Sequence, residues 1–221
     1  MLTIHGIPIS VHVRKVLVTA NLKAISHRVE PVIPFNPPSG WGTLSPTGLI
    51  PAMTDGDFSI AESTAICSYL EAKTTTPTIF SADARDQSRV LFFDGYAGHM
   101  FRSLVHGLFF QKIINPGILK GQTDQSIVDN LLNTVRPKTF GYLESQITGK
   151  YLVGNALTLA DIAVASNLIN YQYLGLAIDP KTYPKLAQYA AGVAALDVFK
   201  STLANERPFA DQMGLDSKFL S

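Results

Sequence analysis

A serine between an expected strand and an expected helix is the first residue whose position could serve chemistry. Ser10 follows a short apolar segment and precedes apolar residues at helical spacing. A hydroxyl at this place can cap the helix by accepting a hydrogen bond from an early backbone amide. The same hydroxyl can donate to an anion at the positive end of the helix. Spacing alone favours the cap.

Glu62 and Ser63 open another expected helix in a similar way. A serine cap is again the simpler interpretation. In the alternative, the amide and hydroxyl of Ser63 receive a ligand carboxylate, and Glu62 meets the ammonium group next to it. An α-amino-acid group carries these two charges side by side. The alternative is therefore a site for the amino-acid end of a ligand.

Three further features favour structural roles. Thr158 and Asp161 fit a capping box, in which a hydroxyl and a carboxylate cap a helix start. Cys67 is the only cysteine and follows an apolar residue in a helix, which is typical of a core residue and excludes an internal disulfide. The five histidines show no metal-ligand spacing, so we expect no metal.

Another candidate site lies on a long expected helix. Four residues at helical spacing there could line a hydrophobic pocket, although such a stripe is more often part of a core. These residues are Tyr96, Met100, Ser103 and Phe110.

The expected secondary structure changes along the chain, from strands and helices in the first part to helices alone in the second. Residues 2–5 and 29–32 are expected strands on either side of a helix over residues 13–20. Five prolines and three glycines predict an irregular loop over residues 34–51, and Asp55-Gly56 predicts a hairpin. A helix follows over residues 66–73, and residues 74–77 form a linker. Beyond it we expect a long helix ending near Asn115-Pro116-Gly117, a helix over residues 127–147 bent at Pro137, and helical regions at 158–174 and 185–203.

Composition excludes several classes of protein. The 221 residues are 46% hydrophobic and 16% charged, which supports a sizeable core, and the formal net charge of +1 gives no general attraction to nucleic acid. We expect no secretory signal and no membrane span, because the chain lacks the required apolar runs. With its single cysteine, the chain is expected in a reducing compartment, the cytoplasm.

The order and spacing of these motifs resemble the cytosolic glutathione transferase family from about residue 2 to residue 206. The resemblance rests on Ser10 with Arg14 four residues later, on Ile50-Pro51-Ala52 with Glu62-Ser63 twelve residues on, and on the Thr158–Asp161 box. It is strongest to serine-type bacterial or plant phi-like members. It implies a thioredoxin-like N-terminal domain (βαβαββα, residues 1–75), an all-α C-terminal domain (residues 82–206) and a tail (residues 207–221).

The resemblance also implies roles for individual residues. Pro51 would be a cis proline, and the backbone of Ile50 would bind the cysteinyl part of glutathione. Glu62 and Ser63 would hold its γ-glutamyl end, and the Ser10 hydroxyl would face the sulfur. The chain departs from the family in having no Lys or Arg between Arg28 and Lys73 for the glycyl carboxylate. The residues considered near the glycyl end are Trp41, His12 and Leu49.

We therefore expect an enzyme that conjugates glutathione, its co-substrate, to small hydrophobic electrophiles. The alternatives are a glutathione-dependent isomerase, dehalogenase or peroxidase, and a binding module of the same fold without turnover. The resemblance further implies a homodimer. A cysteine-based disulfide reductase is disfavoured because the corresponding position holds Ser10.

Overall fold

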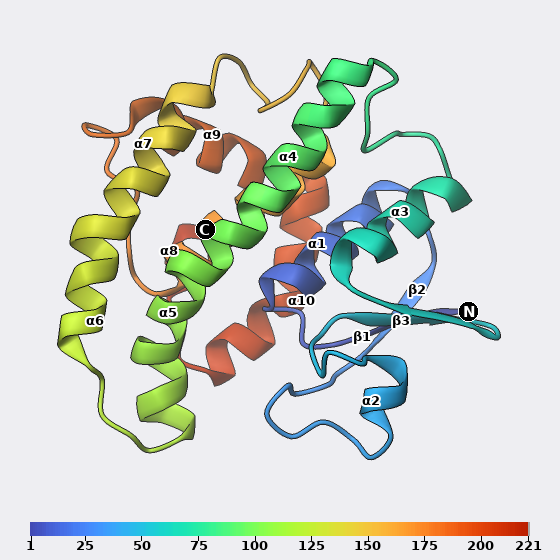
Figure 1. Cartoon of the computed structure of the whole chain (residues 1–221), viewed down its shortest axis with the longest axis horizontal. Helices are drawn as coiled ribbons and strands as arrows, with labels where there is room; N and C mark the ends of the chain where they lie inside the picture. Colours follow the sequence, from blue (N-terminus) through green and yellow to red (C-terminus); the bar gives the residue numbers. More distant parts are fainter. Residues whose placement is uncertain (221) are drawn as a thin grey trace.

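The computed structural model describes residues 1–220, and its first part is a four-stranded sheet with three helices. The elements are β1 (Leu2–His5), α1 (Val11–Leu22), β2 (His27–Glu30), α2 (Trp41–Leu44), β3 (Ala52–Asp55), β4 (Phe58–Ala61) and α3 (Ser63–Lys73). This order confirms the predicted βαβαββα fold. The strands lie in the order β2-β1-β3-β4, with β1 parallel to β2 and antiparallel to β3. Helices α1 and α3 cover one face of the sheet, and α2 lies at the other (Figure 1).

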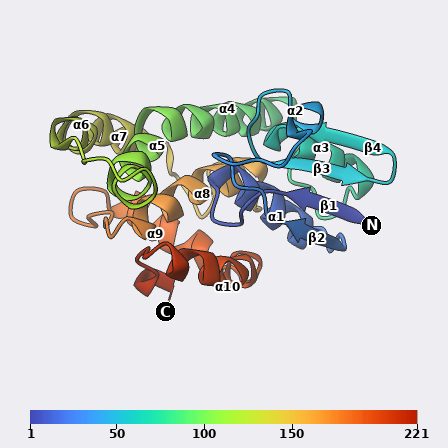
Figure 2. The same ribbon diagram turned by 90° about the horizontal axis from the view of Figure 1, so that it is seen from below.

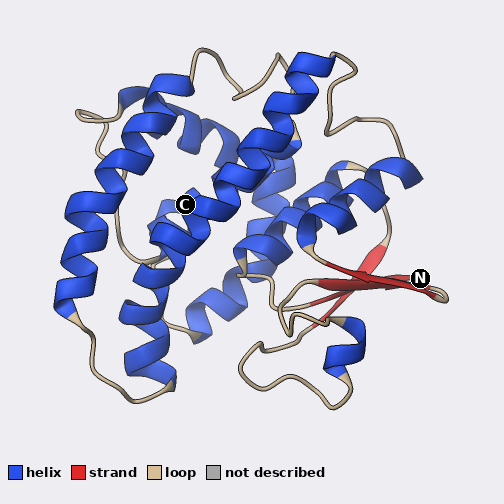
Figure 3. Ribbon diagram, in the orientation of Figure 1, coloured by secondary structure: helices blue, strands red, loops and turns tan. Residues whose placement is uncertain are grey.

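The rest of the described chain is helical, as predicted (Figure 3). Its α-helices are α4 (Ala84–Met100), α5 (His106–Phe109), α6 (Gln125–Asn130), α7 (Arg136–Gln146), α8 (Leu159–Tyr173), α9 (Pro184–Ala194) and α10 (Asp197–Gln212). Helix α8 is the centre of this domain: nearly all of its side chains are buried, and it packs on α4 and on α1. Figure 2 shows α8 between α4 and α10. No helix among the described residues is long and apolar enough to cross a membrane.

Two long helical rods contain π-helical segments. One rod joins α4 to α5 through Phe101–Val105 and then ends in a second π-helical segment, Phe110–Ile118. The other joins α6 to α7 through Leu131–Val135, so its irregularity precedes Pro137, which lies in the first turn of α7. Such segments are frequent at functional sites.

Some boundaries differ from the sequence-based prediction. The region 185–203 is two helices, because the chain turns at Ala195-Leu196 between α9 and α10, and α10 continues to Gln212. Strand β2 begins at His27, two residues before the predicted start. The proline-rich loop contains the short helix α2. The predicted hairpin is confirmed, with Asp55 paired to Phe58.

A buried ionic network joins α1 to the helical domain. The guanidinium of Arg14 is fully buried and donates to both carboxylate oxygens of Glu206, on α10, at 2.8–3.1 Å. It also donates to the Ser166 carbonyl (2.8 Å) and to Asn170 Oδ1 (2.7 Å), both on α8. Loss of one partner would leave a buried charge unpaired, which is strongly destabilising. The start of α1, where Ser10 lies, is therefore held firmly at the domain boundary.

Candidate functional site

Ser10 occupies the N-cap position of α1, but its hydroxyl does not cap the helix. The backbone is extended there (φ −67°, ψ 131°), and the Ser10 carbonyl accepts the amide of Arg14 at 2.8 Å. No hydrogen bond of the Ser10 hydroxyl to the described part of the chain is found, although the side chain is half-buried. The simpler of the two sequence interpretations, a capping hydroxyl, is therefore wrong. The hydroxyl is free to act on a ligand at the positive end of α1.

The predicted cis peptide bond between Ile50 and Pro51 is confirmed. It lies beside the turn that leads to Ser10, because Gly6 of that turn packs on Ile50. A Cβ at Gly6 would lie 3.2 Å from Ile50 Cβ and only 2.5 Å from Val13 Cγ2, so no larger residue fits there without movement. The carbonyl of Pro51 accepts the amide of Glu62 at 3.3 Å, which places the start of α3 next to the same loop.

Glu62, and not Ser63, caps α3. One carboxylate oxygen of Glu62 accepts the amides of Thr64 (3.0 Å) and Ala65 (3.2 Å), and the other accepts the Ser63 hydroxyl (3.2 Å). Partial burial raises the pKa of Glu62, but these backbone bonds and the charge of Lys15 lower it overall. Glu62 has φ +82°, a conformation that costs about 1–3 kcal/mol for a non-glycine residue and is enriched at ligand sites. No acceptor for the amide of Ser63 is found among the described residues, and its contact with a ligand stays a prediction.

A cavity of about 270 Å³ lies beside Glu62 and Ser63, between the two domains. Its walls come from the first turns of α1 and α3, from α4 with the π-helical segment that follows it, and from α8. The polar side chains from outside α3 that line it are His12, Lys15, Asp94, Arg102 and Asn167. A second cavity, of about 340 Å³, lies between β2 and α10 and contains none of the predicted site residues.

Lys15, Thr64 and Asp94 form a closed set of bonds under this cavity. Lys15 Nζ donates to Asp94 Oδ1 at 2.7 Å and to the Thr64 hydroxyl at 3.0 Å, and that hydroxyl donates to Asp94 Oδ2 at 2.6 Å. Both charged side chains are almost fully buried. Because the three residues come from α1, α3 and α4, the set fixes the first turn of α3 against the helical domain.

His12 reaches the cavity from α1 as a neutral imidazole. Burial, followed by the nearby charge of Lys15, lowers the pKa of His12 to about 4. Its ring packs edge-on against Phe101, with ring centroids 4.7 Å apart. No hydrogen bond joins the ring nitrogens of His12 to the described residues, so they are open to a ligand.

Trp41 and Leu49 lie on the loop near the expected glycyl end. The indole nitrogen of Trp41 donates to the Gly48 carbonyl at 3.1 Å, so this donor already holds the loop. The carbonyl of Leu49 accepts the Ser45 hydroxyl at 2.7 Å, while the Leu49 side chain is 64% exposed. A contact of either residue with a ligand stays a prediction.

The four residues expected to form a hydrophobic pocket do not line the 270 Å³ cavity. Met100 is fully buried, and the Tyr96 hydroxyl donates to a backbone carbonyl of α7 at 3.5 Å. The Ser103 hydroxyl is buried without a partner, and the ring of Phe110 stacks near His106. The cavity wall is instead an adjacent face of α4 that carries small residues such as Gly98.

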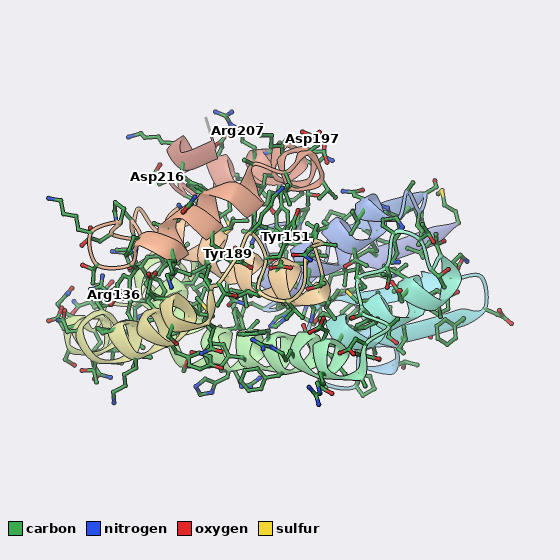
Figure 4. The ribbon with its side chains drawn as sticks, turned by 90° about the horizontal axis from the view of Figure 1, so that it is seen from above. Arg136, Tyr151, Tyr189, Asp197, Arg207 and Asp216 are labelled. Atoms are coloured by element: carbon green, nitrogen blue, oxygen red, sulfur yellow. The ribbon has the colours of Figure 1, made fainter. Side chains whose placement is uncertain are left out.

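Cys67 and Asp161 have structural positions, as predicted. Cys67 is fully buried, and burial raises its pKa to about 11, which makes it a poor nucleophile. Asp161 Oδ2 accepts the amide and hydroxyl of Thr158, and Oδ1 accepts the Leu152 amide (2.8 Å) and the hydroxyl of Tyr189 (3.1 Å), a residue labelled in Figure 4. Asp161 therefore closes the capping box and anchors the loop before α8.

Sequence reasoning missed Arg102 and Asn167 as site residues. Arg102 follows the apolar stripe of α4 and looks like an ordinary surface charge, and Asn167 lies inside the buried helix α8. Helix α8 carries several polar residues, among them Ser166, Asn170 and Gln172, so its sequence did not single out Asn167. Among the described residues, no cluster of three or more His, Cys, Asp or Glu is arranged to hold a metal ion.

Comparison with known proteins gives the following matches. Family models of the glutathione S-transferase N-terminal and C-terminal domains match residues 4–78 and 110–206. Glutathione S-transferase 1 of Zea mays is 32% identical over 53% of this chain and 55% of that protein, so this match spans about half of the relative's length. A glutathione S-transferase of Triticum aestivum is 25% identical over 94% of this chain and 95% of its own. The solved apo structure of glutathione S-transferase III is 28% identical and superposes with a TM-score of 0.77 over 92% of this chain and 95% of that chain.

Proposed function

This chain belongs to the glutathione S-transferase family, and we propose that it conjugates reduced glutathione to small hydrophobic electrophiles. The observation that carries the proposal is the free Ser10 hydroxyl at the start of α1. It lies on the turn that packs against the cis Ile50-Pro51 loop, and that loop is bonded to the start of α3. These contacts connect the turn that carries Ser10, the Ile50-Pro51 loop and the start of α3, and this connection supports the proposal.

In this proposal each group has a distinct part. The backbone of Ile50 binds the cysteinyl part of glutathione, and Glu62 and Ser63 hold the γ-glutamyl end. The Ser10 hydroxyl donates to the sulfur and, together with the positive end of α1, favours the thiolate over the thiol. The thiolate then forms a carbon–sulfur bond with the electrophile in the cleft between the domains. The electrophile's leaving group departs with the electron pair.

The test combines binding with turnover. Calorimetric titration with reduced glutathione should give a dissociation constant tighter than about 1 mM, or about −4.1 kcal/mol. Conjugation to an activated aryl halide such as chlorodinitrobenzene should follow enzyme concentration. Binding without turnover of any electrophile in a broad panel would instead identify a binding module. Absence of binding would refute the proposal.

We also propose a homodimer in the cytoplasm. Three large apolar side chains, Phe58, Leu91 and Phe92, are 41–51% exposed on β4 and α4. Phe92 lies against Tyr96 and Tyr142, so the exposed ring is part of a larger aromatic cluster. Light scattering should give twice the chain mass of 24.0 kDa, and Phe92→Asp should shift it toward the monomer. A wild-type monomer at micromolar concentration would refute this part, and cell fractionation tests the location.

A further inference from the structure

The two long helical rods of the second domain are held in a fixed antiparallel register. The rod that begins with α4 lies beside the rod that ends with α7 (Figure 1). The Tyr96 hydroxyl of the first rod donates to the Thr139 carbonyl of the second at 3.5 Å. Farther along, Gly107 packs so closely on Leu131 that a Cβ at Gly107 would lie 2.9 Å from Leu131 Cδ1. The residues between these two contacts therefore face each other across the rods.

This register brings the two π-helical segments together. Phe101–Val105 of the first rod contacts Leu131–Val135 of the second, and α8 also contacts the first segment. Ser103 lies within one segment, and Arg136 directly follows the other. Tyr171 of α8 lies at the same level, because its hydroxyl accepts a hydrogen bond from Arg136 Nη1 at 3.3 Å. Three polar side chains from three helical elements thus gather at the place where both rods depart from regular helix.

Each of these side chains has a donor without an acceptor among residues 1–220. The Ser103 hydroxyl is buried without a partner and does not bond back to its own helix, as helical serines often do. Arg136 Nε is also buried without a partner. Tyr171 accepts from Arg136, and burial raises the pKa of its phenol, so the phenol keeps a proton that it can donate. Buried donors of this kind are costly unless an acceptor meets them.

The charge of Arg136 is also unbalanced. No carboxylate in the described part of the chain forms an ion pair with Arg136, and its one hydrogen bond is to the neutral phenol of Tyr171. The fully buried Arg14, in contrast, is paired with Glu206 at 2.8 Å. Guanidinium groups away from water are normally paired in this way. An acceptor that brought a negative charge would satisfy the donors and balance the cation together.

An anion fits these groups better than a water molecule. A water molecule has two lone pairs, which are too few for three donors, and it brings two hydrogens that need acceptors of their own. An anion has acceptor capacity alone, and its hydrogen bonds are charge-assisted. The occupant must be small, because Tyr171 is fully buried and none of the three residues lines either cavity described above.

We propose that Ser103, Arg136 and Tyr171 form a binding site for a halide ion, which is chloride under physiological conditions. The ion accepts the two hydroxyl protons and the Arg136 Nε proton, and it balances the guanidinium. It joins the two rods to α8 at their π-helical segments and so stabilises the helical domain. The site is separate from the proposed thiol site and does not depend on the proposed function.

Bromide gives a direct test, because it replaces chloride and scatters X-rays anomalously. In crystals of the whole chain grown in bromide, an anomalous peak should lie within hydrogen-bond distance of Ser103 Oγ, Arg136 Nε and Tyr171 Oη. Density at that point without an anomalous signal would identify a water molecule and overturn the proposal. A peak in the crystal without any solution effect at physiological chloride would show binding at crystal concentration only, which would also overturn it.

The solution test is the melting temperature as chloride replaces gluconate at constant ionic strength. For wild type, it should rise by about 3–5 °C for each tenfold increase in chloride above the dissociation constant. Arg136→Met removes the cation at similar length and should abolish this rise. Arg89→Met, an equal charge change at an exposed position of α4, is the control and should keep it.

A milder variant keeps the test decisive if Arg136→Met does not fold. Ser103→Ala removes one donor and leaves the guanidinium in place, so it should weaken chloride binding about tenfold. Ser88→Ala, at an exposed position of α4, is its control and should leave the chloride dependence unchanged.

The opposite results would refute the inference. Equal melting temperatures of wild type in chloride and in gluconate would show that no halide binds. A chloride response that Arg136→Met and Ser103→Ala both retain would show that the ion binds elsewhere. Because no measurement uses glutathione, failure of this inference leaves the proposed function untouched, and failure of the proposed function leaves this inference untouched.

Discussion

Replacing Ser10 with alanine separates the two roles that a serine can have at the start of a helix. A capping serine contributes about 0.5–2 kcal/mol to stability, but this hydroxyl makes no capping bond. Ser10→Ala should therefore change the free energy of unfolding by less than about 0.5 kcal/mol. The affinity for glutathione should also change little, because its other contacts are kept. The loss should appear in the ionisation of the bound thiol.

The expected magnitude follows from the thiol pKa. A free thiol with a pKa of about 8.5 is roughly 3% ionised at pH 7, and a bound thiol at about 6.5 is roughly 75% ionised. That difference corresponds to about 2.7 kcal/mol, which one hydroxyl donor and one helix start can supply together. If Ser10→Ala raises the bound pKa by one to two units, the thiolate fraction at pH 7 falls about threefold to twenty-fivefold. The conjugation rate should fall by a similar factor and recover above about pH 9.

The assay is the ultraviolet absorbance of the thiolate in the glutathione complex, followed across pH. Ser10→Thr keeps a hydroxyl and is the matched control, so its titration should lie close to that of wild type. Conjugation rates over the same pH range give an independent reading. If wild type and Ser10→Ala titrate together, the hydroxyl does not stabilise the thiolate and the proposed role of Ser10 is refuted. His12, whose ring nitrogens are open to the cavity, would then be the next residue to test.

Three further predictions concern residues around the site. Glu62→Ala should weaken glutathione binding by about 1.5–3 kcal/mol, and it should also destabilise α3 because Glu62 caps that helix. Calorimetry measures the binding and thermal unfolding measures the stability. An unchanged dissociation constant in a folded variant would remove Glu62 from the site. Asp161→Ala should lower stability by at least about 0.5–2 kcal/mol with little effect on glutathione affinity, and affinity loss at an unchanged melting temperature would contradict its structural role. Because the pKa of His12 is lowered to about 4, its contribution to stability is fully present above its unfolded pKa of about 6.5 and is lost as the pH falls toward 4. In urea unfolding, the free energy of unfolding of wild type should fall by up to about 3 kcal/mol as the pH is lowered over that range, and His12→Gln should lack this fall. Equal pH profiles of the two proteins would refute this prediction.

Local sequence patterns were enough to predict the structure wherever the contacts that determine it join residues close together in the chain. Thr158 and Asp161 are three residues apart, and their side chains and amides meet as soon as one helical turn forms. The turn at Asp55-Gly56 similarly sets the register of β3 and β4. The prediction of the cis bond before Pro51 depended on the family resemblance, because most X-Pro bonds are trans and no local pattern indicates the exception.

The tertiary structure decided which side chains face the site. Two adjacent faces of α4 carry apolar or small residues, so helical periodicity could not tell which one borders the cavity. The packing of α4 on α8 decided it. Arg102 and Asn167 are far apart in the chain and line the same cavity only because the rod that begins with α4 packs on α8. The Glu62 carboxylate caps the helix that follows it, with the Glu62 backbone at φ +82°. Composition and spacing do not predict this backbone conformation. Side-chain direction at a domain boundary is set by contacts distant in the sequence, and a local pattern carries no information about them.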